Sequence, residues 1–486
     1  MFLPIENHHD LEVMMKIHDL IVCTRRPFPT RKCIGHFLLL IFTVLTNPST
    51  ARAQAGYVDP GFLNNLSGPN SWVWALAWQP DGRLLVGGQF TSFNGVPGGE
   101  VVRLNPDGNV DTNFTASVSA GDPTIHSVAV QPDGRVLIGG MFTGINGTTR
   151  VRVARLNPDG SLDSNFTASV NSSQSFVTVS HLGLQTNSQI VIGGWFESVN
   201  GAPHTNIARL DSNGSPDPGY NAQIDTPPNA LTIQTDGKVL IGGAFSTVNG
   251  QTQPHIARLN TNGTLDTTFL PVTDGNVDSF APQGDGKIVI GGGFNTVNTV
   301  SRHRIARLNP DGTLDTTFQN GMAGADSYVG CVAVDPNGKI LVGGQFSTVN
   351  GVGRTNVARL NSNGSLDTNF LANTDSFLEL MLVQPDSRVI IEGSYISTVD
   401  GRSRNRLARL QSSNAPFLSR PRRAGGIFSF DVNAVAGKTY GVEASTNLPG
   451  NWSLVLSTNA AVDNLTFSDL NATQFPRRFF RVYKSP

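Results

Sequence analysis

The feature that most constrains the fold is a segment of about fifty residues that occurs seven times in tandem. With local changes, each copy carries an apolar run ending in Gly-Gly-x-Phe, an Asn-Gly turn, Ala-Arg-Leu-Asn and Asp-Gly-x-Leu-Asp-x-x-Phe. A tandem repeat of this length predicts that each copy is one structural unit packed against its neighbours. The Gly pairs lie at Gly87-Gly88, Gly139-Gly140, Gly193-Gly194, Gly242-Gly243, Gly291-Gly292 and Gly343-Gly344, with Glu392-Gly393 in the last copy.

The pattern inside a copy is typical of short β-strands. In the second copy, residues 125–130 alternate between apolar and polar, and residues 135–140 form an almost continuous apolar run. Pro132, Asp133 and Gly134 between them are turn residues, which predicts a hairpin. We therefore expect four short strands per copy. An aromatic residue follows each Gly pair, which indicates one shared structural role, at Phe90, Phe142, Phe196, Phe245, Phe294, Phe346 and Tyr395.

These units predict an all-β fold, a seven-bladed β-propeller over residues 56–410. A small antiparallel sheet must bury both of its faces, and radially arranged neighbours can cover them. A β-helix rung would be much shorter, and a sandwich would not repeat its sequence.

The two ends of the array predict how the ring closes. The last copy stops after Leu410 and lacks the Leu-Asp-x-x-Phe segment, whereas residues 58–62 supply a similar segment before the first copy. We expect this N-terminal strand to pair into the seventh blade, which leaves no open sheet edge.

An arginine and an aspartate recur once per copy, which predicts a partly buried structural ion pair in every blade. The arginine precedes the Leu-Asn of the third strand, and the aspartate lies in the fourth. A guanidinium fork suits a carboxylate better than a lysine does. The pairs are Arg103 with Asp111, Arg155 with Asp163, Arg209 with Asp217, Arg258 with Asp266, Arg307 with Asp315, Arg359 with Asp367, and Arg409 with Asp59.

From Val58 to Leu410 the chain resembles the delta-60 repeat family, a bacterial repeat defined by the Ile-Gly-Gly-x-Phe, Ala-Arg-Leu-Asn and Asp-Gly-x-Leu-Asp-x-x-Phe elements. The resemblance implies a secreted or cell-surface propeller-like protein and brings no catalytic residues. The chain departs from the pattern at residues 185–188, at residues 298–299 and around Glu392.

Residues 1–55 are expected to be a signal peptide with a long leading region. Basic residues precede an apolar run over 34–45, and Ala53 and Ala55 fit a small-x-small cleavage site. The run is shorter than the roughly twenty residues needed to span a bilayer, so a retained anchor is the weaker interpretation. Of the three cysteines only Cys331 would remain, as a buried inert thiol. The formal charge would fall from −1 to −3, which argues against a nucleic-acid surface.

The chain beyond the array predicts a linker over 411–426 and a small β-sandwich-like module over 427–486. Alternating residues at 428–432 and 440–444, and the apolar end at 479–483, indicate strands. The module resembles the C-terminal modules of secreted proteins from Verrucomicrobia-like bacteria.

Candidate ligand-binding residues are those that differ between copies. Trp72 and Trp195 can stack on sugar rings, and Glu197 lies beside Trp195, although Trp74 is expected to pack in the core. The histidines His204, His255 and His303 lie in related loops, but their offsets argue against a metal site. Arg302 and Arg304 can contribute to a basic rim that suits an acidic polysaccharide, against the default of scattered surface charge.

Catalytic signatures are few in this chain, which has no Gly-x-Ser-x-Gly and no His-Glu-x-x-His motif. Loops such as residues 157–163 space oxygen atoms as a calcium site does, but they lack its terminal glutamate, so we expect no cofactor and keep calcium as the minor alternative. We expect a secreted, monomeric binding or scaffold protein that contacts glycan or cell-envelope material. The alternatives are a polysaccharide lyase or glycoside hydrolase, and a purely architectural surface protein.

Overall fold

A computed structural model describes residues 55–59, 62–63, 66–120 and 123–411, together with six strands between residues 418 and 484. This part of the chain is all-β and contains no helix, and thus none able to cross a membrane. The chain divides into two compact units, Ala55–Ser412 and a second that combines Met1–Gln54 with Ser413–Pro486. The predicted signal peptide up to Gln54 lies outside the described residues, as do residues 412–417 and 425–426 of the predicted linker. Residues 418–424 of that linker form a strand, so the linker prediction is wrong there.

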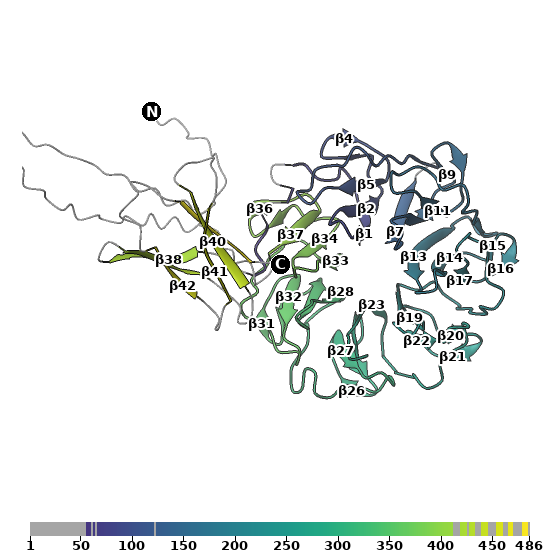
Figure 1. Ribbon diagram of the computed structural model, residues 1–486. Helices are drawn as coiled ribbons and strands as arrows, with labels where there is room; N and C mark the ends of the chain where they lie inside the picture. Colours follow the sequence, from purple (N-terminus) through teal and green to yellow (C-terminus); the bar gives the residue numbers. More distant parts are fainter. Residues whose placement is uncertain are drawn as a thin grey trace, which may run out of the picture. The chain divides into compact units, whose positions relative to one another are not determined.

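The unit Ala55–Ser412 is a ring of seven three-stranded antiparallel sheets, so the predicted propeller is confirmed (Figure 1). The innermost strands of successive sheets contact one another, and the last of them contacts the first. In chain order, the three strands of each sheet are β1 (Val73–Trp78), β2 (Leu84–Gly88) and β5 (Val101–Leu104); β7 (Thr124–Val130), β8 (Val136–Met141) and β11 (Val153–Leu156); β13 (Thr178–Leu184), β14 (Ile190–Trp195) and β17 (Ile207–Leu210); β18 (Ala230–Ile233), β19 (Val239–Gly242) and β22 (Ile256–Leu259); β23 (Val277–Pro282), β24 (Ile288–Gly292) and β27 (Ile305–Leu308); β28 (Val329–Val334), β29 (Ile340–Gly344) and β32 (Val357–Leu360); and β33 (Leu380–Val383), β34 (Val389–Glu392) and β37 (Leu407–Leu410).

A short hairpin follows the middle strand of every sheet, with an Asn-Gly or Asp-Gly turn in six of them and an Asn298-Thr299 turn in the fifth. In two of the hairpins a further short strand pairs alongside, β6 (Val118–Ser119) and β12 (Val170–Asn171). The hairpins are β3 (Ser92–Phe93) with β4 (Val96–Pro97), β9 (Gly144–Ile145) with β10 (Thr148–Thr149), β15 (Ser198–Val199) with β16 (Ala202–Pro203), β20 (Thr247–Val248) with β21 (Gln251–Thr252), β25 (Thr296–Val297) with β26 (Val300–Ser301), β30 (Thr348–Val349) with β31 (Val352–Gly353), and β35 (Thr398–Val399) with β36 (Arg402–Ser403).

The expected fourth strand of each copy is reduced to a single β-bridge, such as Leu259 with Leu265. The chain turns immediately afterwards because the Asp266 carboxylate accepts the backbone N–H of Thr268, and its carbonyl accepts the N–H of Phe269. The prediction of four strands per copy is therefore wrong in this respect, since the aspartate makes a turn where a strand would continue.

The N-terminal segment closes the ring as expected. Val58 bridges Leu410, the Asp59 N–H donates to the Arg409 carbonyl at 2.7 Å, and the Gln411 N–H donates to the Tyr57 carbonyl at 2.7 Å. Residues from the two ends of the array therefore complete one sheet together.

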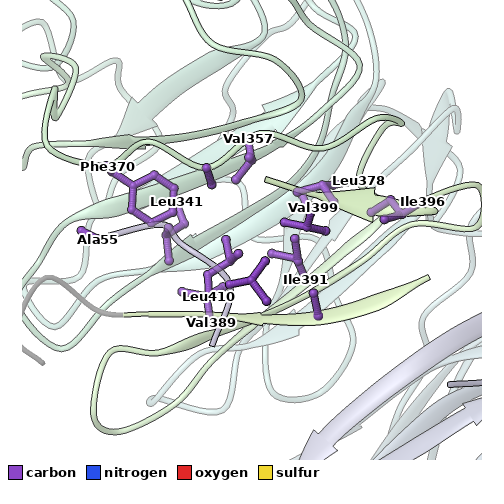
Figure 2. Close-up of a cluster of buried hydrophobic side chains, with 14 residues drawn as sticks. Ala55, Leu341, Val357, Phe370, Leu378, Val389, Ile391, Ile396, Val399 and Leu410 are labelled. Carbon is purple, nitrogen blue, oxygen red and sulfur yellow. The ribbon is translucent and has the colours of Figure 1, made fainter. Parts of the chain in front are cut away.

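The cores of the ring lie between neighbouring sheets. In one of them Ala55 from the N-terminal segment packs with Leu341, Val389 and Leu410, which belong to the last two sheets (Figure 2). The middle strands are buried on both faces, which explains why their sequences are nearly continuous apolar runs.

The predicted arginine–aspartate pair is present in all seven sheets. The Nε–Oδ2 distances lie between 2.7 and 2.9 Å. Each guanidinium also lies over the aromatic ring of the Asp-x-x-Phe motif or its Tyr220 equivalent, with 4.3 to 5.0 Å between its central carbon and the ring centroid. The arginine therefore fixes the turn of its own sheet.

Six of these arginines also join one sheet to the next. Arg258 donates from Nη1 to the carbonyl of Pro310 in the following sheet, at 2.6 Å. Arg409 of the last sheet donates to Pro106 of the first sheet, at 2.8 Å, so the link continues across the closure. The corresponding acceptors of Arg103, Arg155, Arg209 and Arg307 are Pro158, Ser212, Thr261 and Ser362.

A second group supports each aspartate from the middle strand of its sheet. Lys238 lies 2.8 Å from Asp266, and in the third sheet the neutral Gln189 donates to Asp217 instead. Burial acts to raise the pKa of the Asp266 carboxyl, but hydrogen bonds from Lys238, Thr268 and Arg258 outweigh it and hold the pKa below its ordinary value.

Replacing Asp266 by Asn should lower the free energy of unfolding by about 3 kcal/mol, because Arg258 would remain buried without its counter-charge. Denaturant unfolding of the full chain measures this change. Asp236→Asn is the matched control in the same blade: Asp236 accepts the Lys238 N–H, and an amide oxygen can do the same. An Asp266→Asn protein as stable as the control would contradict the structural role of the pair.

The turn asparagine of the hairpin ties three segments together. Asn249 has a φ of 51°, accepts the N–H of Gln223 and donates from Nδ2 to the carbonyl of Gly263. In the seventh copy this position is Asp400, which accepts the N–H of Asn373 but cannot donate when ionised. Its Oδ2 is buried and without a hydrogen-bond partner among the described residues, and burial raises the pKa of Asp400 to about 6.

Asp400→Asn should stabilise the protein at neutral pH and have less effect in acid. Because its pKa is raised in the folded state, protonated Asp400 contributes to the free energy of unfolding. This contribution is complete below the ordinary pKa of 3.8 and is lost as the pH rises through about 6. Unfolding midpoints of both proteins at pH 4 and pH 7.5 test this. A difference that does not change with pH would contradict it.

The second unit contains two three-stranded antiparallel sheets, as predicted for a β module. Strands β39, β40 and β43 match the three expected segments. The first sheet has the order β38 (Leu418–Ala424), β39 (Ile427–Val432), β42 (Leu465–Asp469), and the second has the order β41 (Ser453–Asn459), β40 (Thr439–Ser445), β43 (Phe479–Lys484).

Candidate functional site

The seven copies differ in side-chain chemistry where the innermost strand of each sheet begins. We call fourteen positions in this region the inner rim. They are Trp74, His126, Ser180, Asn229, Asp278, Gly330 and Glu379, and the residues two positions earlier, Trp72, Thr124, Thr178, Pro227, Asn276, Tyr328 and Phe377.

A β-bulge brings these side chains out of the strand pairing. In five of the sheets the register between the innermost and middle strands shifts here, for example between Ile125 and Ser127, which leaves His126 as the extra residue. The second glycine of the Gly pair permits the bulge, since a Cβ on Gly140 would lie 2.1 Å from the Thr124 carbonyl oxygen. The repeated glycine thus serves as scaffold for the variable position beside it.

Polar side chains on the third to sixth sheets form a hydrogen-bonded chain along the inner rim. Ser180 Oγ lies 2.9 Å from His181 Nδ1, and His181 Nε2 lies 3.0 Å from the carbonyl oxygen of Asn229. Asn229 Nδ2 donates to Asp278 Oδ1 at 2.7 Å, and the Tyr328 side chain hydrogen-bonds to Asp278. One polar group from each sheet therefore orients the group on the next.

The proton of His181 is fixed by its partners. A carbonyl oxygen can only accept, so Nε2 carries the hydrogen and Nδ1 accepts from the Ser180 hydroxyl. Burial lowers the pKa of His181 to about 4. The imidazole is thus neutral at physiological pH and is a weak base.

Aromatic side chains occupy the inner rim on the sixth, seventh and first sheets, which are neighbours around the ring. The rings of Trp72 and Trp74 lie 5.9 Å apart, and those of Phe377 and the adjacent loop residue Tyr395 are also 5.9 Å apart. Trp72, Tyr328 and Tyr395 have exposed fractions of 38%, 42% and 65%. Such exposure of large rings is more than packing requires, and it gives one sector of the rim an aromatic surface.

Two glutamates of the seventh sheet lie close to this aromatic sector. Glu379 accepts hydrogen bonds from the backbone N–H and the hydroxyl of Ser394. Glu392 replaces the first glycine of the Gly pair, is fully buried, and has no hydrogen-bond partner for either oxygen among the described residues. Burial raises the pKa of Glu392 well above its ordinary value, and the negative charge of Glu379 adds to this effect.

Glu392→Gln should stabilise the protein in alkaline solution. Because the folded-state pKa is raised, the contribution of Glu392 to stability is complete below pH 4.5 and is lost as the pH rises through the raised pKa. Unfolding free energies of the two proteins should therefore be similar at pH 4 and diverge by pH 8.5. A wild-type protein that is more stable than Glu392→Gln at pH 8.5 would contradict this prediction and would indicate that the Glu392 carboxylate has a partner.

The structure places the predicted aromatic candidates at or beside the inner rim. Trp72 lies on it, and Trp195, which is 44% exposed, is paired with the rim residue Thr178. Glu197 is occupied in holding a loop, since it accepts the N–H and hydroxyl of Ser173. Trp74 is half-buried and packs against Trp72 and His126, so the expected core position is wrong because the bulge shifts the residue towards the rim.

The three candidate histidines occupy three different repeat positions. His255 directly precedes its third strand, whereas His303 is two residues and His204 three residues before theirs. Among the described residues no group of three histidine, cysteine or carboxylate side chains could hold a metal ion. Arg302 and Arg304 each donate to backbone carbonyls of their own sheet, at Ser301 and Gly293, so both guanidinium groups support loops.

The oxygen-rich loops proposed as a minor calcium alternative form internal hydrogen bonds. Asp159 Oδ1 accepts the N–H and the hydroxyl of Ser161, and Asp163 pairs with Arg155. These oxygen atoms therefore already stabilise the turn.

The seventh copy contains one extra residue, so the prediction that Tyr395 shares the structural role of the phenylalanines is wrong. Ile396, which is 2% exposed, takes the place of the phenylalanine that follows the Gly pair in the other copies. The backbone N–H of Arg406 donates to the Ile396 carbonyl, as the N–H of Arg304 donates to the Phe294 carbonyl in the fifth copy. Tyr395 is displaced into solvent. Cys331 is buried, as expected, and burial raises the pKa of its thiol.

Sequence reasoning missed most of the inner rim, including Ser180, His181, Asn229, Asp278 and Tyr328. Aligning the copies on the Gly pair would have shown that chemistry varies at these positions. The bulge, however, breaks the alternation from which strand faces are read, so the sequence pattern alone does not show that they converge.

Comparison with known proteins agrees with the fold. Six segments match the family model described as a domain of unknown function (DUF5122), beta-propeller, and one matches the WD domain, G-beta repeat. The chain is a β-propeller repeat protein. The segments that match the DUF5122 model are residues 79–114, 131–166, 185–220, 234–269, 283–318 and 336–370. The segment that matches the WD model is residues 61–95.

Solved structures of similar fold have low sequence identity. The extracellular domain of BT4673 from B. thetaiotaomicron is 11% identical with a TM-score of 0.43, covering 86% of this chain and 54% of that one, so the propeller protein spans about half of its length. Virginiamycin B lyase from Staphylococcus aureus is 10% identical with a TM-score of 0.43, covering 71% and 96%. Similarity at this level says nothing of ligand or activity. No curated protein matches the chain.

Proposed function

We propose that this protein is a secreted or surface-held carbohydrate-binding propeller whose ligand contacts the inner rim. The observation that carries the proposal is the division of the rim into an exposed aromatic sector and a neighbouring hydrogen-bonded polar sector. A sugar ring has an apolar face and hydroxyl edges, so it needs both kinds of surface. The resemblance to delta-60 repeats and the signal-like N-terminal segment support an extracellular address.

Non-catalytic binding is favoured over catalysis by the chemistry of Ser180 and His181. The pair has the spacing of a nucleophile and a base, and the Asn229 carbonyl orients the imidazole. A histidine with a pKa of about 4 is, however, too weak a base to remove the serine proton effectively near neutral pH. A carbohydrate-active enzyme is therefore the second candidate.

A panel of soluble polysaccharides and oligosaccharides incubated with the purified chain separates these functions. Binding is recorded by calorimetry and turnover by the release of reducing ends. Binding without turnover supports the proposal, and turnover supports the enzyme. If neither binding nor turnover is detected, the architectural protein is the remaining alternative.

Trp72→Ala should weaken binding of the best carbohydrate from this panel by at least roughly tenfold, since an exposed aromatic anchor is lost. Val352→Ala is the control, because Val352 is 44% exposed but lies on an outer hairpin. Equal affinities of the two variants would place the ligand away from the inner rim.

A further inference from the structure

Two carboxylates near the aromatic sector are held by neutral hydrogen-bond donors. Asp278 is bound by the neutral groups of Asn229 and Tyr328, and Glu379 by Ser394. The repeated aspartates, such as Asp266, each pair with an arginine. No ion pair to Asp278 or Glu379 is found within the described part of the ring.

The two carboxylates and the aromatic rings form one continuous group. Tyr328 hydrogen-bonds to Asp278 and is also within electrostatic range of Glu379. Ser394, which binds Glu379, directly precedes the exposed Tyr395, whose ring packs on Phe377. An occupant of this sector would thus meet aromatic faces and negative charge together.

Positive charge is scarce at this place. None of the fourteen inner-rim positions is lysine or arginine. Two basic groups act electrostatically on carboxyl groups here, His255 on Asp278 and Arg406 on Glu392. The Arg406 guanidinium donates to the Pro69 carbonyl and to Asn405, so it is held by neutral acceptors.

We propose that the carbohydrate bound at the inner rim carries a protonated amine, which pairs with Asp278 and Glu379 and lies against the tyrosine rings. An ammonium group donates to carboxylates and is attracted to aromatic faces, and the gain increases where water is excluded. An acidic polysaccharide would meet only repulsion from the same carboxylates. This inference rests on the proposed function and adds the chemical class of the ligand.

The test compares two hexasaccharides that differ only in N-acetylation, which replaces the protonated amine by a neutral amide, the hexamer of glucosamine and the hexamer of N-acetylglucosamine. Both are titrated into the full chain at pH 6 and low salt. The glucosamine hexamer should bind at least roughly tenfold more tightly, as expected for a charge-assisted hydrogen bond. The preference should decrease as salt is added.

The double variant Asp278→Asn/Glu379→Gln should abolish this preference, which is read as the ratio of the two affinities. Amide oxygens can still accept from Asn229 and Ser394, so the fold should be retained, and the unfolding midpoint checks this. Asp225→Asn/Asp326→Asn is the matched control with the same change in charge. Both aspartates accept backbone N–H groups at outer hairpins.

Each outcome decides between the two proposals. Equal binding of the two hexamers, or tighter binding of the N-acetylated one, overturns the amine inference and retains carbohydrate binding. A preference that persists in the Asp278→Asn/Glu379→Gln variant also overturns it. If neither hexamer nor any member of the carbohydrate panel binds, the proposed function itself fails.

Discussion

The structure depends on one repeated interaction, a buried arginine that joins three parts of the ring. Arg258 pairs with the aspartate of its own turn, covers the aromatic ring that follows, and donates to a carbonyl of the next sheet. A small sheet in a propeller has little core of its own, so its position must be fixed by contacts with its neighbours. A guanidinium can form these contacts together because its donors are fixed in one plane, and a lysine ammonium cannot. This explains why the residue recurs without exception.

The inner rim follows from a second constraint, the close approach of backbone to the Gly pair. The carbonyl of Thr124 lies where a Cβ on Gly140 would be, and this approach accompanies the bulge that displays His126. The Gly pair that supports the strand pairing and the variable inner-rim residue therefore lie next to each other. In the five sheets with a bulge, the middle strand keeps its Gly pair while the displayed side chain changes from copy to copy.

The seventh sheet combines ring closure with most of the departures from the repeat. Glu392 stands where the other copies have glycine, Asp400 where they have asparagine, and an extra residue displaces Tyr395. The fold tolerates two buried acids here because each can hold a proton, as their raised pKa values indicate. The extra residue also adds the exposed ring of Tyr395 to the aromatic sector of the rim.

The sequence alone determined the architecture, because periodic features depend only on local chemistry and on counting. The seven copies, the arginine–aspartate pairs and the pairing of Asp59 with Arg409 are all evident from spacing. The site was decided by tertiary structure. Each of Asn229, Asp278 and Tyr328 lies about fifty residues from the next along the chain, and they meet only because neighbouring sheets converge at the ring axis. In the fifth sheet a one-residue bulge, which leaves no mark on composition, takes Asp278 out of the strand pairing.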